Sequence, residues 1–161
     1  MGAVAALALA QTSPAAIYLL GRSVEKVKPV VDKIKETSPS TVAEFVQCDT
    51  GDNSSVRAAA TKLMSLLAST SNGEIHGLVN NAGISATKQY QVSKDGIESQ
   101  FAVNHLGHFL LTNLLKDEIL KGKGVVLQIS SGAFYMTDSN FNDENFNVGY
   151  LIMAPSSLRA D

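Results

Sequence analysis

Small and polar residues stand at the ends of four short apolar runs in this sequence. They are Gly21-Arg22, Asp49, Asn80-Asn81-Ala82-Gly83 and Ser130-Ser131. Amide, carboxylate, guanidinium and hydroxyl groups can hydrogen-bond a nucleotide, and small residues let the backbone approach a flat ligand closely. If the four runs are parallel strands, these residues share one edge of a sheet, which is where the ligands of open α/β sheets bind. The pattern therefore predicts a nucleotide or cofactor site.

Two charged residues at these ends allow more than one interpretation. Arg22 follows the first run, at the position that decides which adenosine ribose a dinucleotide fold accepts. A guanidinium there suits a 2′-phosphate, whereas an acid would bond a 2′-hydroxyl; the alternative is an ordinary exposed arginine. Asp49 either accepts a hydrogen bond from an adenine amino group or caps the helix that follows it.

Segments of helical periodicity separate the apolar runs. We expect strands over residues 17–20, 42–48, 75–79 and 125–129, and helices over 24–36, 56–68 and 96–120. Continuous apolar strands that alternate with helices predict an α/β fold, with a doubly wound parallel sheet covered on both faces. Asp52 or Ser54 can cap the helix over 56–68. The Ala-rich segment 3–10 resembles either a buried helix or a secretory signal peptide, and the helix is favoured because no Lys or Arg precedes Arg22.

The composition excludes several classes of protein. The chain has 161 residues, 17% of them charged, and a formal net charge of −2. These values fit one globular domain, and the sequence has no basic patch of the kind found in nucleic-acid binders. A single cysteine, Cys48, cannot form an internal disulfide, and no apolar run approaches the ~18–20 residues that span a bilayer. We therefore expect a soluble protein of a reducing compartment, the cytoplasm, with no nucleic-acid partner and no membrane segment.

Three stretches resemble one known family. Leu78-Val79-Asn80-Asn81-Ala82-Gly83 is similar to the N-N-A-G signature of the short-chain dehydrogenase/reductase family. The stretch from Phe101 to Phe109 resembles the family's fifth-helix segment, in the version typical of its retinol-dehydrogenase-like members. The stretch from Val126 to Ser131 is similar to the strand that carries the family's catalytic serine. The resemblance spans about residues 2–147.

This resemblance implies a Rossmann-type fold, a nicotinamide cofactor and hydride exchange between a hydroxyl and a carbonyl. It implies that Ser131 hydrogen-bonds the reacting oxygen and that Asn104 holds a water in a proton relay; the alternative for Asn104 is a bond to neighbouring backbone. Arg22 then indicates NADP(H) rather than NAD(H), and Asp49 meets the adenine. The cofactor-binding residues by this comparison are Gly2, Arg22, Asp49, Asn80, Asn81, Ala82 and Gly83.

Three other residues, His105, His108 and Cys48, receive structural interpretations. His105 and His108 are three residues apart without a third ligand candidate, so we expect helix packing and no metal site. Cys48 is expected to be an inert buried thiol.

The sequence departs from the family pattern at both ends. The family opens with a strand and a T-G-x-x-x-G-x-G loop, of which only the last glycine is matched, by Gly2. The family's catalytic tyrosine belongs to a Y-x-x-x-K pair, but Ala154 stands four residues after Tyr150 and Ser139 four residues after Tyr135. No lysine follows Lys123. A phenol without that cation keeps a pKa near ~10 and is a poor acid at neutral pH.

We therefore expect an incomplete Rossmann-type sheet that lacks the first strand and the C-terminal third. Residues 1–150 would form a partial NAD(P)-binding domain and 151–161 a divergent tail. The expected function is an NADP(H)-dependent oxidoreductase acting on a small lipophilic alcohol or carbonyl, catalytically incomplete as this chain. We expect no NADPH binding that fluorescence or calorimetry detects at ordinary concentrations. The alternative is a non-catalytic fragment or interaction protein. An exposed sheet edge also predicts self-association.

Overall fold

The fold is that of a computed structural model, which describes residues 1–85 and 90–132. In chain order its elements are α1 (Gly2–Ala10), β1 (Ala16–Gly21), α2 (Val24–Thr37), β2 (Val42–Gln47), α3 (Asn53–Thr70), β3 (Gly77–Asn80), α4 (Ser99–Phe101), the π-helical turn η1 (Ala102–Leu106), α5 (Gly107–Leu114), α6 (Lys116–Lys121) and β4 (Val125–Gln128). The alternation of strands and helices predicted from the sequence is confirmed. The predicted tail over 151–161 lies outside the described residues.

The described strands form two parallel pairs. β1 pairs with β2 in the register Ala16↔Val42, and β3 pairs with β4 in the register Gly77↔Val125. Within residues 1–85 and 90–132, no ladder joins the two pairs to one another. The predicted α/β fold with an incomplete parallel sheet is therefore confirmed, and the interruption lies between β1 and β3.

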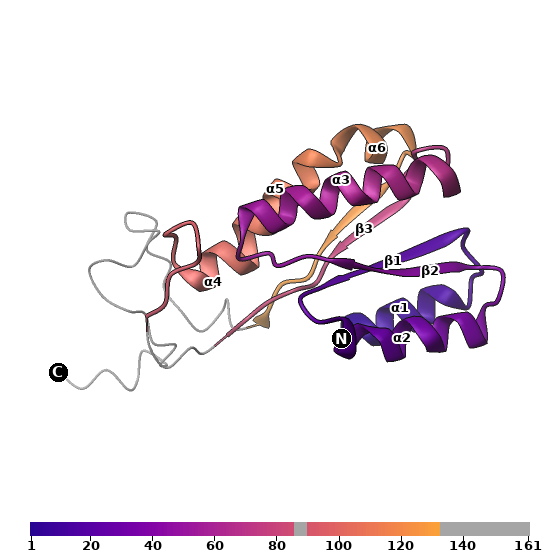
Figure 1. Cartoon of the computed structure of the whole chain (residues 1–161), viewed down its shortest axis with the longest axis horizontal. Coiled ribbons are helices and arrows are strands. Elements are labelled where there is room, and N and C mark those ends of the chain that lie inside the picture. The colour runs from indigo at the N-terminus through magenta and orange to yellow at the C-terminus, as the bar shows by residue number, and fades with distance from the viewer. Residues whose placement is uncertain (86–89, 133–161) are drawn as a thin grey trace.

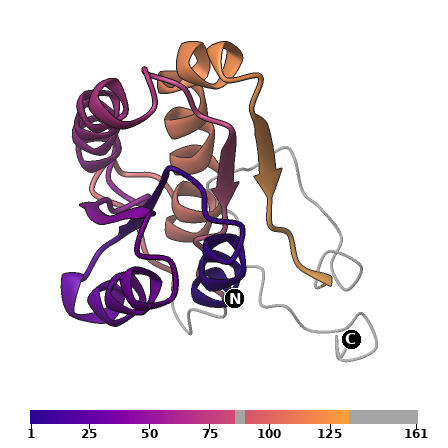
Figure 2. The same cartoon turned by 90° about the vertical axis from the view of Figure 1, so that its right-hand side faces the viewer.

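Helices cover the strands from two sides (Figures 1 and 2). α1 and α2 lie on one face, while α3, α5 and α6 lie on the other. Each layer has its own apolar core, because side chains alternate between the faces of a strand. Under α3 and α5 the buried cluster includes Val46, Val56, Leu63, Leu111 and Leu115, and under α1 and α2 it includes Ala6, Ala10, Val31, Ile34 and Ala43.

Side chains fix where the longer helices begin. Ser23 caps α2 by accepting a hydrogen bond from the Lys26 N–H, and Asp52 caps α3 by accepting from the N–H groups of Ser54 and Ser55. Of the two caps considered for this helix, the structure uses Asp52. The Ala-rich segment forms α1 as predicted, and Ala10 on it is fully buried.

The single helix predicted over residues 96–120 is wrong in its extent. Gly96 takes a φ of +76° in a turn, and the helix starts only at Ser99, capped by Glu98. The Gly107 N–H then donates to the Ala102 carbonyl five residues back, which gives a π-helical turn. A second break at Leu115 separates α5 from α6.

The strand predicted over 75–79 also begins later, at Gly77. The Ile75 N–H donates to the Glu118 carbonyl at 3.0 Å, so this residue pairs with α6 instead of a strand. Within the ranges that the structure describes, no helix is long and apolar enough to cross a membrane.

Candidate cofactor site

The carboxyl ends of the strands carry the residues that the sequence singled out. Arg22 directly follows β1, Asp49 lies two residues beyond β2, Asn80 ends β3, and Ser131 lies three residues beyond β4. Because the strands of each pair run parallel, these residues lie at one edge of their sheet. Each of these residues therefore follows the carboxyl end of its strand, while their shared role as one site stays a prediction.

Asn104, in the π-helical turn, hydrogen-bonds to the loop after β3. Its Nδ2 donates to the Ile84 carbonyl at 2.9 Å, and its Oδ1 accepts from the Ile84 N–H at 2.8 Å. Both backbone groups of one residue are thus held by one amide, which fixes the course of the loop that begins at Asn81. This is the backbone interaction considered from the sequence; the water-relay role of Asn104 stays a prediction.

Helix α5 also approaches the loop after β2. A Cβ on Gly107 would lie 2.1 Å from the Thr50 carbonyl oxygen, so only glycine permits this approach. A Cβ on Gly51 would lie 3.0 Å from a methyl group of Val103, in the π-helical turn. One helical segment therefore contacts the loops that follow both β2 and β3.

Asp49 shapes its own loop and does not cap α3. Its Oδ1 accepts from the Gly51 N–H at 2.9 Å, and its N–H donates to the Ser55 hydroxyl at 2.9 Å. The cap is Asp52, which also accepts from Lys94 Nζ at 2.6 Å, and this hydrogen bond lowers the pKa of the Asp52 carboxyl. The helix-capping alternative for Asp49 is therefore wrong, and its adenine contact stays a prediction.

The two asparagines after β3 have different surroundings. Asn80 is 2% exposed and its Nδ2 donates to Thr112 Oγ1 at 3.0 Å, while its Oδ1 is buried without a hydrogen-bond partner among residues 1–85 and 90–132. Asn81 lies against the start of α1, where a Cβ on Gly2 would come within 2.7 Å of its Nδ2. The start of α1 therefore lies beside this loop.

Other predicted site residues face solvent. Ala82, Gly83, Arg22 and Ser131 are all exposed. The backbone carbonyl of Arg22 accepts from Gln47 Nε2 at 3.1 Å, which fixes the main chain at the start of its loop. Tyr135, Tyr150 and the residues four positions after each lie outside the described ranges.

The two histidines and the cysteine pack as the sequence predicted. The His105 ring stacks between Phe101 and Phe109, with centroid distances of 5.4 and 6.3 Å. His108 is buried, and burial lowers its pKa. Cys48 is also buried, which raises the pKa of its thiol to about 11. Over the described part of the chain, no three His, Cys, Asp or Glu side chains gather as metal ligands.

Sequence reasoning missed two residues that position this edge. Gly107 carried a usable signal, because a glycine inside a helical pattern often marks a close backbone approach. Glu98 carried none, since it stood inside the predicted helix. In the structure it is fully buried, and its Oε2 accepts from the Phe101 N–H at 2.7 Å.

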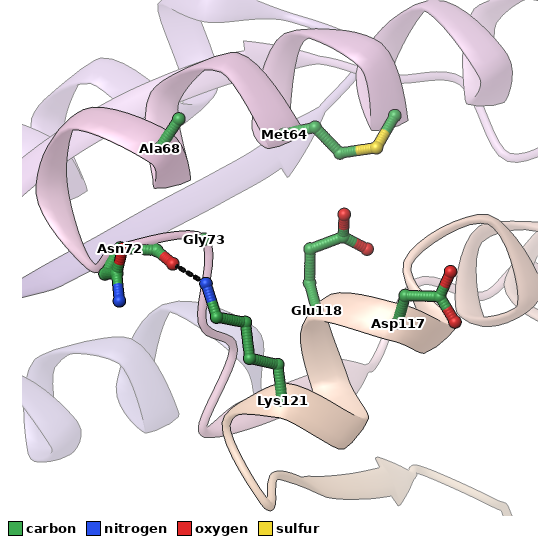
Figure 3. A pocket seen from close by; sticks show the side chains of 7 residues that line it. All are labelled: Met64, Ala68, Asn72, Gly73, Asp117, Glu118 and Lys121. Carbon is green, nitrogen blue, oxygen red and sulfur yellow. Dashed lines mark hydrogen bonds between the residues drawn. The ribbon is translucent and has the colours of Figure 1, made fainter.

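The structure also contains a surface cavity of about 360 Å³ away from these residues. It lies between the end of α3 and α6, where Lys121 donates a hydrogen bond to the Asn72 carbonyl (Figure 3). Asn72 and Gly73 precede β3, so the cavity is at the opposite end of that strand from Asn80. None of the predicted site residues lines it.

Comparisons with known proteins agree with the fold. Residues 1–141 match the family described as short chain dehydrogenase. Polyprenol dehydrogenase of Homo sapiens is 36% identical over 133 residues, which are 79% of this chain and 38% of that protein. The chain thus spans well under half of this relative.

Two solved structures have a similar fold. The crystal structure of an uncharacterized protein from Mycobacterium Paratuberculosis superposes with a TM-score of 0.75 and 30% identity, over 94% of this chain and 50% of that one. A metagenomic short-chain oxidoreductase in complex with NADP gives 0.66 and 27%, over 81% of this chain and 57% of that one.

Proposed function

Because the chain belongs to the short-chain dehydrogenase family, we propose that it carries the adenosine side and part of the catalytic edge of an NADP(H)-dependent oxidoreductase. The substrate class we propose is a small lipophilic alcohol or carbonyl compound. The observation that carries the proposal is the placement of Arg22, Asp49, Asn81 and Ser131 at strand carboxyl ends, with Asn104 holding the loop after β3. The similar oxidoreductase solved with NADP supports the choice of cofactor.

The residues present fit an adenosine phosphate. Ala82 and Gly83 are exposed and have little or no side chain, so a flat base can approach their backbone. The Asp49 carboxylate is an acceptor for an adenine amino group. The exposed Arg22 guanidinium offers a planar fork of donors that matches a 2′-phosphate. Gly2, at the start of α1, lies beside the same loop, since a Cβ at this position would come within 2.7 Å of Asn81 Nδ2.

The catalytic part of the proposal rests on Ser131 and Asn104. A bound nicotinamide cofactor would supply or accept the hydride. The Ser131 hydroxyl, beyond β4, would hydrogen-bond the substrate oxygen, and Asn104 would order a water for proton transfer. Tyr150 has Ala154 where the family places its lysine. We therefore propose that the 161-residue chain does not turn over by itself.

Binding of adenosine fragments tests the cofactor choice. We expect adenosine 2′,5′-bisphosphate to bind about tenfold more tightly than 5′-AMP, because a charge-assisted hydrogen bond contributes ~1.5–3 kcal/mol. Saturation-transfer NMR or calorimetry at millimolar ligand measures both. Arg22→Ala should abolish the difference, whereas Arg57→Ala, at an exposed site on α3, should leave it unchanged. Equal affinities for the two nucleotides would refute the NADP(H) assignment.

A turnover assay tests the catalytic part separately. NADPH absorbance at 340 nm is followed with short-chain and lipophilic aldehydes, and we expect no consumption above background. Consumption that Ser131→Ala abolishes would contradict the proposed incompleteness while supporting the oxidoreductase assignment.

We also propose that the purified chain self-associates through a sheet edge. Among the described residues no ladder joins β1 to β3, and a strand whose backbone groups are unpaired templates strand pairing. A monomer of 17.0 kDa across a range of concentrations in light scattering would refute this. The predicted cytoplasmic location stays a prediction.

A further inference from the structure

The cavity between α3 and α6 combines an apolar wall with a charged one (Figure 3). Its volume of about 360 Å³ falls within the range of ~300–1,000 Å³ that small-molecule sites occupy. Met64 and Ala68, one turn apart on α3, supply the apolar wall, and α6 supplies charged side chains opposite to it. Such a cavity suits a small amphipathic molecule.

The charged residues of this cavity do not pair with one another. Asp117 and Glu118 lie four and three residues before Lys121 on α6, spacings at which a carboxylate and an ammonium usually meet on a helix. Neither carboxylate lies within 4.0 Å of the Lys121 ammonium. The ammonium donates instead to the Asn72 carbonyl, at the end of α3 (Figure 3). Opposite charges are thus held apart in the wall of one cavity.

The Glu118 carboxylate can accept hydrogen bonds from a ligand. Glu118 is half-buried, and its side chain points toward α3, below Met64 in Figure 3. Within residues 1–85 and 90–132, no group donates a hydrogen bond to this carboxylate. The structural bonds of the residue are made by its main chain, because the Glu118 carbonyl accepts from the N–H groups of Ile75 at 3.0 Å and Gly122 at 3.1 Å.

The Lys121 ammonium is fixed in place and still has donors to offer. It carries three N–H groups, and the bond to the Asn72 carbonyl uses one of them. Gly73, whose φ is +74°, lies beside it, since a Cβ at that position would be 3.5 Å from Lys121 Nζ. The cavity therefore presents an anchored cation, an unpaired carboxylate and an apolar wall.

We propose that this cavity binds a free zwitterionic α-amino acid with an apolar side chain. The ammonium of the ligand pairs with the Glu118 carboxylate, and its carboxylate pairs with the Lys121 ammonium. Its side chain contacts Met64 and Ala68. A simple anion would be repelled by the Glu118 carboxylate, and a simple cation by the Lys121 ammonium, whereas a zwitterion satisfies both. The site lies at the end of β3 opposite to Asn80, and the inference does not depend on the proposed oxidoreductase role.

An NMR titration of the full 161-residue chain tests the proposal. The probe is L-leucine, and the signals followed are the Met64 methyl group and the amides of Ala68 and Gly73. Three matched ligands each lack one feature: L-leucinamide lacks the carboxylate, 4-methylpentanoate lacks the ammonium, and glycine lacks the apolar side chain. We expect saturable shifts with L-leucine at millimolar concentration and at least about tenfold weaker binding of each matched ligand, because each loses one of the proposed contacts.

Three results would overturn the proposal. Equal binding of L-leucine and L-leucinamide would show a site for organic cations, and equal binding of 4-methylpentanoate would show a site for anions. The absence of shifts at these signals up to about 50 mM L-leucine would show that no such ligand binds. Adenosine 2′,5′-bisphosphate should leave the leucine-induced shifts unchanged, and displacement of L-leucine by this nucleotide would contradict a separate site.

Substitutions test each charge separately. Glu118→Gln and Lys121→Met should each weaken L-leucine binding at least about tenfold. Glu118→Gln should not weaken 4-methylpentanoate, which has no ammonium, and Lys121→Met should not weaken L-leucinamide, which has no carboxylate. The matched controls Glu36→Gln and Lys35→Met, at exposed positions on α2, should leave L-leucine binding unchanged.

An unchanged far-UV spectrum shows that a variant folds, and undiminished L-leucine affinity in either folded cavity variant would contradict the assigned contacts. The comparison of ligands on the parent chain needs no variant, so it decides the proposal even if a substitution prevents folding.

Discussion

Replacing Gly107 by alanine should separate helix α5 from the loop after β2. The added Cβ would lie 2.1 Å from the Thr50 carbonyl oxygen and 2.8 Å from the Thr50 carbonyl carbon. Ordinary contacts of this kind are near ~3.5 Å, so the backbone must retreat by more than about 1 Å. Backbone atoms cannot turn aside as a flexible side chain can, and the whole helix end has to move.

The free energy of unfolding should fall despite a gain in helix propensity. Overpacking of this severity should cost about 3 kcal/mol, the upper end of the usual range. Alanine in place of glycine within a helix gains only about 1 kcal/mol. The net loss of about 2 kcal/mol corresponds to a midpoint shift of about 1 M in urea. Gly77→Ala is the control, because a Cβ there meets nothing within 4 Å. We expect its change to stay within about 0.5 kcal/mol.

Urea unfolding followed by circular dichroism measures both variants, and hydrogen exchange at Asp49 and Gly51 reports on the loop itself. We expect faster exchange at these two amides in Gly107→Ala and no change in Gly77→Ala. A Gly107→Ala protein as stable as the parent would show that α5 does not approach Thr50 this closely.

Three further predictions follow from the packing of the same region. Asn104→Ala should lower the free energy of unfolding by about 1–2 kcal/mol, because two hydrogen bonds to Ile84 are lost, and should speed exchange of the Ile84 amide at least tenfold; an unchanged exchange rate would contradict the pairing. Because burial raises the pKa of the Cys48 thiol to about 11, this thiol should react with iodoacetamide at pH 8 on the order of a hundredfold more slowly than an exposed thiol of pKa ~8.5. A rate similar to that of the exposed thiol would refute the burial of Cys48. Because the pKa of His108 is lowered in the folded chain, the unfolded chain binds a proton at this residue more readily, and the free energy of unfolding should fall as the pH drops below the ordinary histidine value of 6.5. Between pH 7.5 and 5.5 the urea midpoint should therefore fall less in His108→Gln than in the parent.

Periodicity and strand composition predicted the fold well because burial decides them locally. The apolar run from Ile17 to Leu20 forms a strand covered on both faces, and the spacing of Val31 and Ile34 forms the buried side of α2. Capping also works from local sequence, since a side chain such as Asp52 bonds backbone groups only two and three residues away.

Long-range backbone contacts explain what the sequence could not predict. Ile75 is apolar and directly precedes β3, yet its N–H bonds to Glu118, forty-three positions later. The π-helical turn likewise has no local signal, because it accompanies the pairing of Asn104 with Ile84 and the approach of Gly107 to Thr50. Among the site residues, the positions of Arg22 and Ser131 after strand ends could be predicted, because each follows an apolar run that forms a strand. The partners of a given side chain depend on how elements distant in sequence come together.

These contacts also explain how the loops of the candidate cofactor site keep their relative positions although the described sheet is interrupted. No described ladder joins β1 to β3, so hydrogen bonds between strands do not fix the loop after β2 relative to the loop after β3. The segment from Asn104 to Gly107 does so instead, because it contacts Ile84 at one end and Thr50 at the other. Its placement depends in turn on the buried cap Glu98.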